Sequence, residues 1–213
     1  MSTPFPTRVR LKIKKIAREL TETSVEREFR RSWPLVDSVE GWLLATEGKW
    51  LFTTARSLPD HVNIAEIGSF KGRSTCCLAL GCRGSGKRVF AVDSFDGGPD
   101  LPRANSFPDF SQNLKRCGVS EHVEPIVGLS GQVAKTWDKP IHFLFIDGSH
   151  LYEDVLVDFT GFFPYIVPGG VVAFHDVNEH FPGVLRAWNE TFKHQFVEIG
   201  HCDSLAYGRR PRR

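Results

Sequence analysis

The stretch Glu66-Ile67-Gly68-Ser69-Phe70-Lys71-Gly72 decides the fold. It follows a short β-rich run at 62–67 and precedes an apolar segment, 73–80, whose pattern predicts a helix. Gly68 can adopt a positive φ, and both glycines allow the backbone to approach a ligand closely. The first turn of the helix offers free N–H groups. The stretch therefore predicts a strand, a tight turn and a helix, with a ligand on the turn.

The rest of the chain repeats this alternation of strand and helix. Further strands are predicted at 88–93, 123–127, 141–146 and 170–174, helices at 107–117, 130–137, 151–165 and 182–194, and a closing hairpin at 196–199 and 204–207. The alternation predicts an α/β fold with a doubly wound, seven-stranded sheet. In such sheets ligands bind beyond the carboxyl ends of the strands, so functional residues are sought there.

The N-terminal part of the chain has a different pattern. Two amphipathic helices are predicted near 8–30 and 38–58, separated by Ser32-Trp33-Pro34. We therefore expect residues 1–58 to form a helical extension that packs on a core formed by residues 59–213. The apolar faces of these helices have two interpretations: docking on the body of the protein, or docking on a second subunit to form a homodimer.

Composition and charge narrow the class of protein. A length of 213 residues with 41% hydrophobic residues suits one globular domain, and no apolar run is long enough for a transmembrane segment. Five cysteines without a CxxC pair predict reduced thiols and a cytoplasmic location. The basic termini, 8–18 and 209–213, have two interpretations: solvated charge, or peripheral contact with an acidic membrane surface.

The spacing of the glycines in the first turn limits which class of ligand it can bind. Its glycines follow GxxxG, so the GxGxxG cradle for a dinucleotide pyrophosphate is not met. Glu66 before the turn suits a cationic amino acid moiety, and Asp93, at the end of the second strand, can accept two ribose hydroxyls. Together they favour an adenosyl site. The loop from Ser94 to Ser106 is rich in Gly and Pro and is either a substrate loop or a plain surface loop.

Two further strand ends carry polar side chains. Asp147 and His150 follow the fourth strand, and His175 and Asp176 follow the fifth. Such a cluster can bind a divalent ion or supply a general base, and the alternative is a purely structural cluster.

Three runs together resemble a known family: Ala65 to Thr75, Phe145 to Tyr152 and Val167 to Asp176. They are similar to class I S-adenosylmethionine (SAM) dependent methyltransferases, and more narrowly to macrocin-type sugar O-methyltransferases and cephalosporin-hydroxylase-like proteins. The resemblance covers residues 36–208. It implies a Rossmann-like sheet with a reversed last strand and SAM as the cofactor.

The resemblance also implies site residues. The cofactor is expected to contact Glu66, Gly68, Ser69, Gly72, Ser74, Asp93, Ser94, Ser130 and Asp147. Asp147, His150 and His175 are the candidate catalytic residues. In metal-dependent relatives, carboxylates matching Asp147 and Asp176 help to hold Mg²⁺ together with an acid before the latter. Here that position is His175, and because Mg²⁺ prefers oxygen ligands the metal stays an alternative.

The predicted function is methyl transfer from SAM to a hydroxyl of a small molecule or sugar. The alternatives are a nicotinamide-dependent oxidoreductase on a related fold and a non-catalytic SAM-binding protein. We expect no nucleic-acid substrate, because no NPPY-like motif is present and the basic runs lie at the termini.

Overall fold

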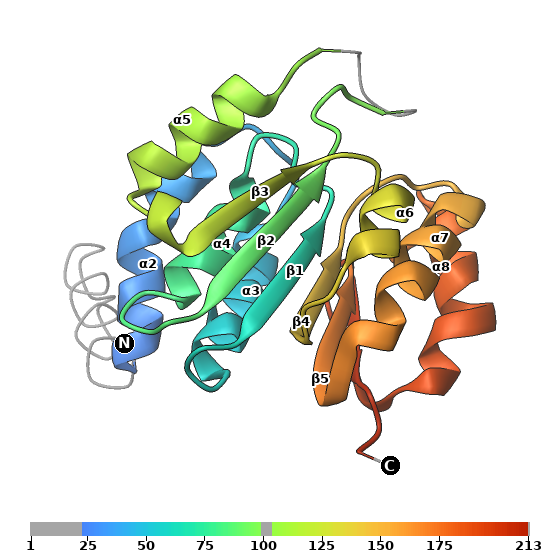
Figure 1. Cartoon of the computed structure of the whole chain (residues 1–213). Coiled ribbons are helices and arrows are strands. Elements are labelled where there is room, and N and C mark those ends of the chain that lie inside the picture. Colours follow the sequence, from blue (N-terminus) through green and yellow to red (C-terminus); the bar gives the residue numbers. More distant parts are fainter. Residues whose placement is uncertain (1–22, 99–103, 213) are drawn as a thin grey trace, which may run out of the picture.

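The computed structural model describes residues 23–98 and 104–212, and within them one seven-stranded sheet forms the centre of the molecule (Figure 1). Its order is β3-β2-β1-β4-β5-β7-β6, with bounds β1 Asn63–Ile67, β2 Arg88–Asp93, β3 Val123–Val127, β4 Ile141–Ile146, β5 Ile166–Phe174, β6 Val197–Cys202 and β7 Leu205–Arg209. The first five strands pair in parallel, whereas β7 is antiparallel to both β5 and β6. The predicted α/β class, the doubly wound order and the reversed last strand are confirmed.

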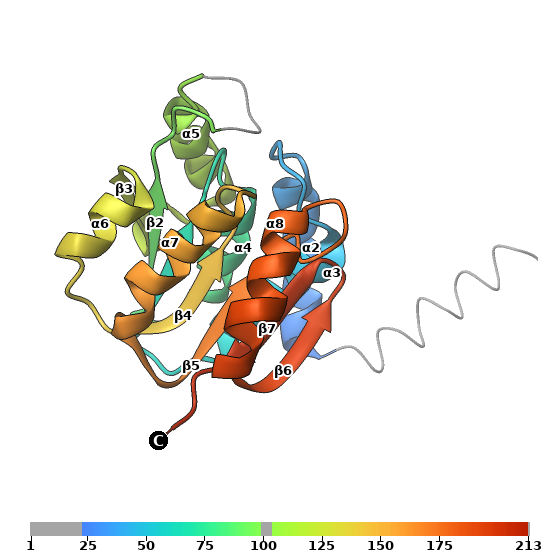
Figure 2. The ribbon, with the colours of Figure 1, turned by 90° about the vertical axis from the view of Figure 1, so that its right-hand side faces the viewer.

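Helices cover both faces of the sheet (Figure 2). One face carries α2 (Ser24–Asp37), α3 (Ala45–Ser57), α4 (Arg73–Gly81) and α5 (Phe107–Cys117). The other carries α6 (Ser130–Val133), α7 (Tyr152–Phe162) and α8 (Pro182–Ala187). Short helical turns complete the chain: η1 Ser120–His122, η2 Ala134–Thr136, η3 Phe163–Tyr165, η4 Trp188–Phe192 and η5 Lys193–Gln195. The expected strands, helices and closing hairpin are thus all present within the described core.

The observed bounds of most strands agree closely with the predicted bounds, whereas the ends of several helices differ. The bounds of β2, β3, β4 and α5 are those predicted. The three helices predicted after β3, β4 and β5 each change, after a shorter α-helix, into a 3-10 or π turn. Periodicity does not distinguish these helical forms here, because the 3-10 and π segments are only three to five residues long.

The predicted break at Ser32-Trp33-Pro34 is wrong. Pro34 lies inside α2, which continues to Asp37. The helix begins with a capping box in which Thr23 and Glu26 satisfy each other's backbone N–H groups. Proline removes one helical hydrogen bond, but here the missing bond is in the last turn, and the helix buries Phe29 and Val36 across it. Residues 8–22 of the predicted first helix lie outside the described residues.

The N-terminal helices share one apolar cluster with the sheet. Leu51, Phe52 and Ala55 of α3 are fully buried in the apolar cluster that also contains residues of β4, β5 and β7. Trp50 stacks on Tyr207 of β7, with 4.4 Å between ring centroids. The α3 helix is therefore part of the apolar core on this face of the sheet.

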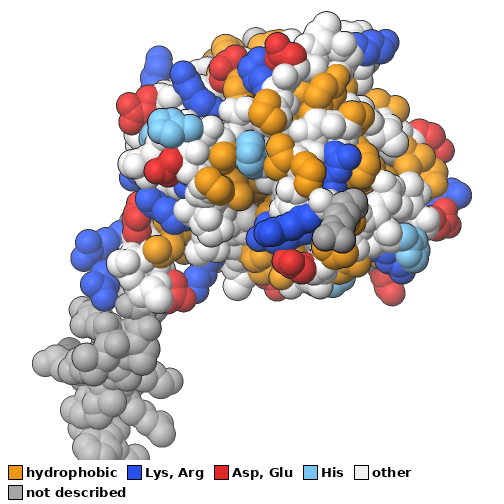
Figure 3. Space-filling model, turned by 60° about the horizontal axis from the view of Figure 1, so that its bottom comes forward, with side chains coloured by type: hydrophobic (Ala, Val, Ile, Leu, Met, Phe, Trp, Pro, Cys, Tyr) orange, Lys and Arg blue, Asp and Glu red, His pale blue; other side chains and the backbone are white. Residues whose placement is uncertain are grey.

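Two of the basic C-terminal residues form hydrogen bonds to backbone carbonyls at the lower end of the sheet. Arg210 donates to the carbonyls of Phe163 and Ile166, and Arg209 donates to the carbonyl of Gly169. Figure 3 shows this end of the molecule, where basic, acidic and apolar side chains are interspersed. The N-terminal basic run lies outside the described residues, so membrane contact through it stays a prediction. No helix among residues 23–98 and 104–212 is long and apolar enough to cross a membrane. All five cysteines are free thiols.

Candidate active site

A cavity of about 1000 Å³ opens at the carboxyl ends of the parallel strands. Two backbone bonds align these ends: the Asp147 N–H donates to Ile67, at 2.8 Å, and the His175 N–H donates to Ile146, at 3.0 Å. Of the residues predicted from the sequence, the cavity is lined by Gly68, Ser69, Ser74, Asp93, Ser94, Ser130, Asp147, His150, His175 and Asp176. Glu66 and Gly72 are not among the lining residues.

The two glycines of the turn are required by the fold itself. Gly68 has φ of +84°, and a Cβ there would lie 2.1 Å from the Asp147 carbonyl oxygen. Gly72 has φ of +88° at the start of α4, and its Cβ would lie 3.0 Å from the Phe110 ring. The close approach that the glycines allow is therefore between β1 and β4 and between α4 and α5, beneath the cavity.

The Glu66 side chain is fully buried under the turn. Its Oε2 accepts hydrogen bonds from the hydroxyls of Ser69 and Thr75, and its Oε1 has no hydrogen-bond partner among the described residues. Burial raises the pKa of Glu66 to about 7, despite these bonds and one with Ser74. A contact between this carboxyl group and a cofactor stays a prediction, since Ser69 and Ser74 line the cavity and Glu66 does not.

Asp93 fastens the same turn from the neighbouring strand. Its Oδ2 accepts the N–H groups of Ser69 and Phe70, at 2.7 and 2.8 Å, and its Oδ1 accepts the N–H of Phe95, at 2.6 Å. A carboxylate has about four acceptor positions, and three are occupied here, so Asp93 has one position left for a ribose hydroxyl from the cavity.

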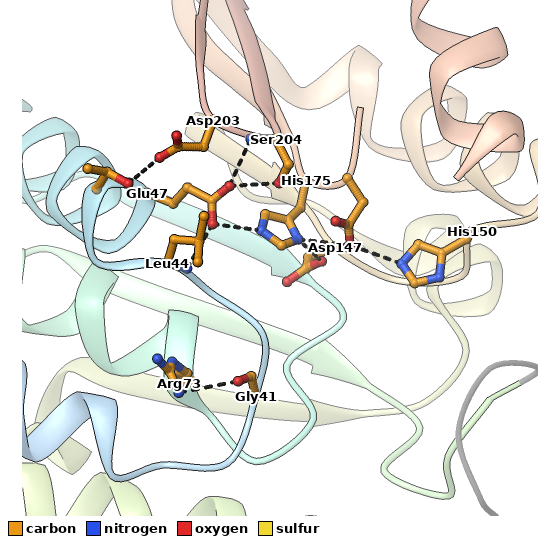
Figure 4. A network of polar contacts seen from close by, with 11 residues as sticks. Gly41, Leu44, Glu47, Arg73, Asp147, His150, His175, Asp203 and Ser204 are labelled. Carbon is orange, nitrogen blue, oxygen red and sulfur yellow. Dashed lines mark hydrogen bonds and ion pairs between the residues drawn. The ribbon is translucent and has the colours of Figure 1, made fainter. Parts of the chain in front are cut away.

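His175 is the centre of a polar network (Figure 4). Its Nδ1 lies 3.1 Å from Asp147 Oδ1 and 3.0 Å from Asp176 Oδ2, and its Nε2 lies 3.2 Å from Glu47 Oε2. The other Glu47 oxygen accepts the N–H and hydroxyl of Ser204, in the β6–β7 turn. Both ring nitrogens face carboxylates, which only accept hydrogen bonds, so the imidazole carries both protons.

The charges of this network support the same conclusion. Burial opposes a charged ring, but the Asp147 charge and the hydrogen bonds to Asp147, Asp176 and Glu47 raise the pKa of His175 far above its usual range. Burial likewise opposes ionisation of Glu47, yet its bonds from His175, Ser204 and the Leu44 N–H lower its pKa to about 2. A protonated, buried His175 cannot accept a proton near neutral pH. This argues against the predicted role of His175 as general base.

His150 has a different setting. Its Nε2 lies 3.3 Å from Asp176 Oδ2, its ring packs on Phe181 with 4.0 Å between centroids, and its side chain is partly exposed to the cavity. Hydrogen bonds from His150 and His175 hold the pKa of Asp176 well below its usual value, although burial opposes this. Asp176 thus orients a histidine that reaches the cavity. Asp176 itself has φ of +59°, which turns the chain sharply after β5.

The predicted metal ligands do not suit Mg²⁺. Ligand atoms of Asp147, His175 and Asp176 lie within 4.8 Å of one another, which is close enough for a metal ion. However, the protonated His175 Nδ1 lies between the two carboxylate oxygens that the ion would need. Mg²⁺ also requires near-octahedral oxygen coordination. In this arrangement the imidazolium takes the place of the cation.

The far end of the cavity combines polar and apolar side chains, of which only Ser130 was predicted from the sequence. Ser130, predicted as a cofactor contact, donates its hydroxyl to Asp158 of α7. Asp158 is buried, and burial raises its pKa to about 6. Leu129 and Val157 are exposed beside it.

Glu47 was not predicted either, because a carboxylate in an amphipathic helix gives no signal that it will contact a histidine at the end of a distant strand. The loop after β2 lines the cavity with Ser94, Gly97, Gly98 and Ser106, while residues 99–103 lie outside the described part.

Comparison with known proteins identifies the family. Residues 65–177, more than half of the chain, match the family model of a methyltransferase domain. An uncharacterized protein of Sinorhizobium fredii is 30% identical over 155 residues, which is 67% of this chain and 16% of that protein. An uncharacterized protein of Acanthamoeba polyphaga mimivirus is 33% identical over 138 residues, 62% of this chain and 59% of that protein. The chain thus spans only part of the length of these relatives.

Solved structures share the whole fold. A cofactor-bound protein of MTB, Rv0187, has a TM-score of 0.67 at 20% identity, with 99% of both chains covered. The O-methyltransferase TomG from Streptomyces achromogenes, in complex with SAM, has a TM-score of 0.64 at 19% identity, with 97% of this chain and all of that chain covered. An O-methyltransferase from Bacillus cereus, in complex with SAH, has a TM-score of 0.62 at 17% identity, covering 93% and 97%. The chain therefore belongs to the methyltransferase domain family and has the Rossmann-like sheet of class I SAM-dependent methyltransferases.

Proposed function

We propose that this protein transfers the methyl group of SAM to a hydroxyl group of a small-molecule acceptor. The observation that supports this most is the single cavity in which the Gly68 turn and Asp93 lie together with Asp147, His150 and Asp176. The first two suit an adenosyl cofactor, and the last three suit an acceptor hydroxyl. Family membership supports the reaction, and the O-methyltransferases among the structural neighbours support oxygen as the acceptor atom.

In this proposal the residues at the strand ends would hold the cofactor. Ser69 and Ser74, at the turn after β1, would contact its methionine part, and Asp93 would bind its ribose. The exposed side chains of Leu129 and Val157, beside Ser130, would contact its adenine. Exposed apolar side chains inside a cavity favour a flat, mostly apolar ligand group, since covering them releases water. SAH is expected to bind in the same pose.

The chain must then remove the hydroxyl proton while the methyl group is transferred. The sulfonium already makes the methyl carbon electrophilic, so the protein's task is to align donor and acceptor and to accept a proton. We assign the proton to His150, which Asp176 orients, and the alignment of the acceptor to Asp147, which His175 holds in place. His175 and Glu47 act by positioning these groups.

No step in this proposal needs Mg²⁺, because the buried imidazolium of His175 already lies between the two carboxylates that would bind the ion and offsets part of their charge. Turnover in buffer treated with a chelator is expected to equal turnover with added Mg²⁺. A loss of turnover on chelation that Mg²⁺ restores would contradict this assignment.

A direct test separates the candidate functions. Calorimetric titration is expected to show binding of SAH and none of NAD, and SAH release is expected when SAM and a hydroxyl acceptor are supplied together. Binding of NAD would favour the oxidoreductase alternative. SAH binding without methyl transfer to any acceptor would favour the non-catalytic one.

The roles of His150 and Asp147 have their own test. His150→Gln and Asp147→Ala are expected to lower turnover by roughly 100-fold or more, the scale of a lost general base or aligning group, with SAH affinity kept in His150→Gln. His194→Gln, at an exposed histidine outside the cavity, is the matched control. Unchanged turnover in His150→Gln would remove its role. A homodimer, a cytoplasmic location and a sugar acceptor stay predictions.

A further inference from the structure

Trp42 is an exposed aromatic side chain that faces the active-site cavity. It is 67% exposed, and its neighbour Leu44, which also lines the cavity, is 54% exposed. The indole lies on Phe70, with 5.8 Å between ring centroids and 29° between the ring planes. One face of Trp42 therefore rests on the turn after β1 while much of the side chain stays open. The other four tryptophans of the chain are partly or fully buried.

The segment that carries Trp42 is firmly held. Arg73 donates from Nη1 to the carbonyls of Asp37, Val39 and Gly41, at 3.2, 3.1 and 3.2 Å, and its Nη2 pairs with the Asp37 carboxylate. Figure 4 shows Arg73 beside Gly41, below the His175 network. An exposed ring on a fixed backbone can bind a flat ligand with little loss of conformational entropy.

The same segment leads directly to the proposed chemistry. The Leu44 N–H donates to Glu47 Oε2, the atom that also pairs with His175. A ring that covers Trp42 and Leu44 would thus lie against the segment that ends at the His175 network.

The charged side chains that line the cavity also bear on which acceptor can bind. The described lining residues include seven Asp or Glu side chains, against three cationic side chains: Arg73, Lys135 and the imidazolium of His175. An anionic acceptor is therefore disfavoured.

We propose that Trp42 is the stacking platform for the methyl acceptor, and that the acceptor is an uncharged molecule with a flat ring face, either an aromatic ring or the apolar face of a pyranose. This inference rests on the proposed function. Both ring types share the same recognition chemistry, which is contact of a flat carbon face with an indole. The experiment distinguishes between them.

The test measures probe binding and turnover with the intact protein. Catechol and methyl glucoside are the neutral probes, and protocatechuate and glucose phosphate are their anionic counterparts. We expect at least one neutral probe to bind the SAH-loaded protein more tightly than its anionic counterpart, and its ring type identifies the acceptor class. Trp42→Ala should then raise the Kd or KM of that probe by about tenfold, the scale of one lost ring contact, and Trp42→Phe should restore most of it.

Two controls keep the outcome specific. SAH affinity should be the same in wild type and Trp42→Ala, and Leu35→Ala, at an exposed leucine of α2 outside the cavity, should change nothing. Unchanged probe affinity in Trp42→Ala, tighter binding of the anionic probes, or no probe binding at all would overturn the inference while leaving SAH binding intact. A change of sedimenting mass in Trp42→Ala would also overturn it, by showing that a second copy covers the ring. Failure of the wild type to bind SAH would instead overturn the proposed function.

Discussion

At the scale of single residues, the buried Glu66 side chain makes the stability of the folded protein depend on pH. Its pKa is about 7 in the folded protein against an ordinary value of 4.5, so the folded state holds one more proton than the unfolded state between these values. Below pH 4.5 the Glu66 side chain is neutral in both states and the folded protein has its full stability. This contribution is lost as the pH rises through 7, because the buried side chain must then ionise. Glu66→Gln stays neutral, and at pH 8 it should be more stable than wild type by on the order of 3 kcal/mol.

Urea denaturation at pH 5 and pH 8 measures this difference. At pH 5 the two proteins should differ little, and Glu124→Gln, at an exposed glutamate of β3, should match wild type at both values. An equal difference between Glu66→Gln and wild type at both pH values would contradict the buried, raised pKa. Calorimetry on the same variant tests the predicted cofactor contact, because loss of SAH affinity would show that the carboxylate itself is used.

Gly68 is the second residue with a sharp prediction. Its added Cβ would lie 2.1 Å from backbone atoms of Asp147, which cannot rotate away, so Gly68→Ala should destabilise the protein by about 3 kcal/mol or more, the upper range for overpacking plus a strained φ. Gly84→Ala is the matched control, since Gly84 has φ of +72° but nothing within 4 Å of its Cβ position. A similar loss in both variants, measured by thermal unfolding, would mean that φ alone, and not contact with β4, explains the glycine.

At the scale of elements, Arg73 couples α4 to the segment between α2 and α3. It donates to the carbonyl of Asp37, the last residue of α2, and to two carbonyls of that segment, and its guanidinium lies 5.4 Å from the centroid of the Trp33 ring. Arg73→Lys keeps the charge but cannot hold several carbonyls at once. We expect a stability loss of about 1–2 kcal/mol and a rise in acceptor KM larger than any change in SAH affinity. Arg186→Lys, at an exposed ion pair on α8, should change neither property.

At the scale of the whole molecule, the N-terminal helices are part of the core. Phe52 is fully buried in the cluster that includes Phe143 and Phe145 of β4. Phe52→Ala should therefore destabilise the protein by about 3–5 kcal/mol, and the fragment 59–213 should lack a cooperative thermal transition. Circular dichroism measures both. A fragment that unfolds cooperatively near the wild-type temperature would instead support residues 1–58 as a separable extension.

The sequence by itself determined the sheet, its strand ends and the residues that follow them. Strand and helix periods are local, and the carboxyl ends of parallel strands necessarily meet at one edge, so Asp93, Asp147 and His175 could be placed in one cavity without coordinates. What depends on three-dimensional contact could not be predicted. The buried partner of His175 is Glu47, 128 residues away, and that contact makes a histidine of the predicted catalytic set a fixed cation. Likewise, only the packing of β1 on β4 shows that Gly68 serves the fold. The protonation of a buried group and the crowding of a glycine depend on neighbours distant in sequence, and tertiary structure alone decides which neighbours those are.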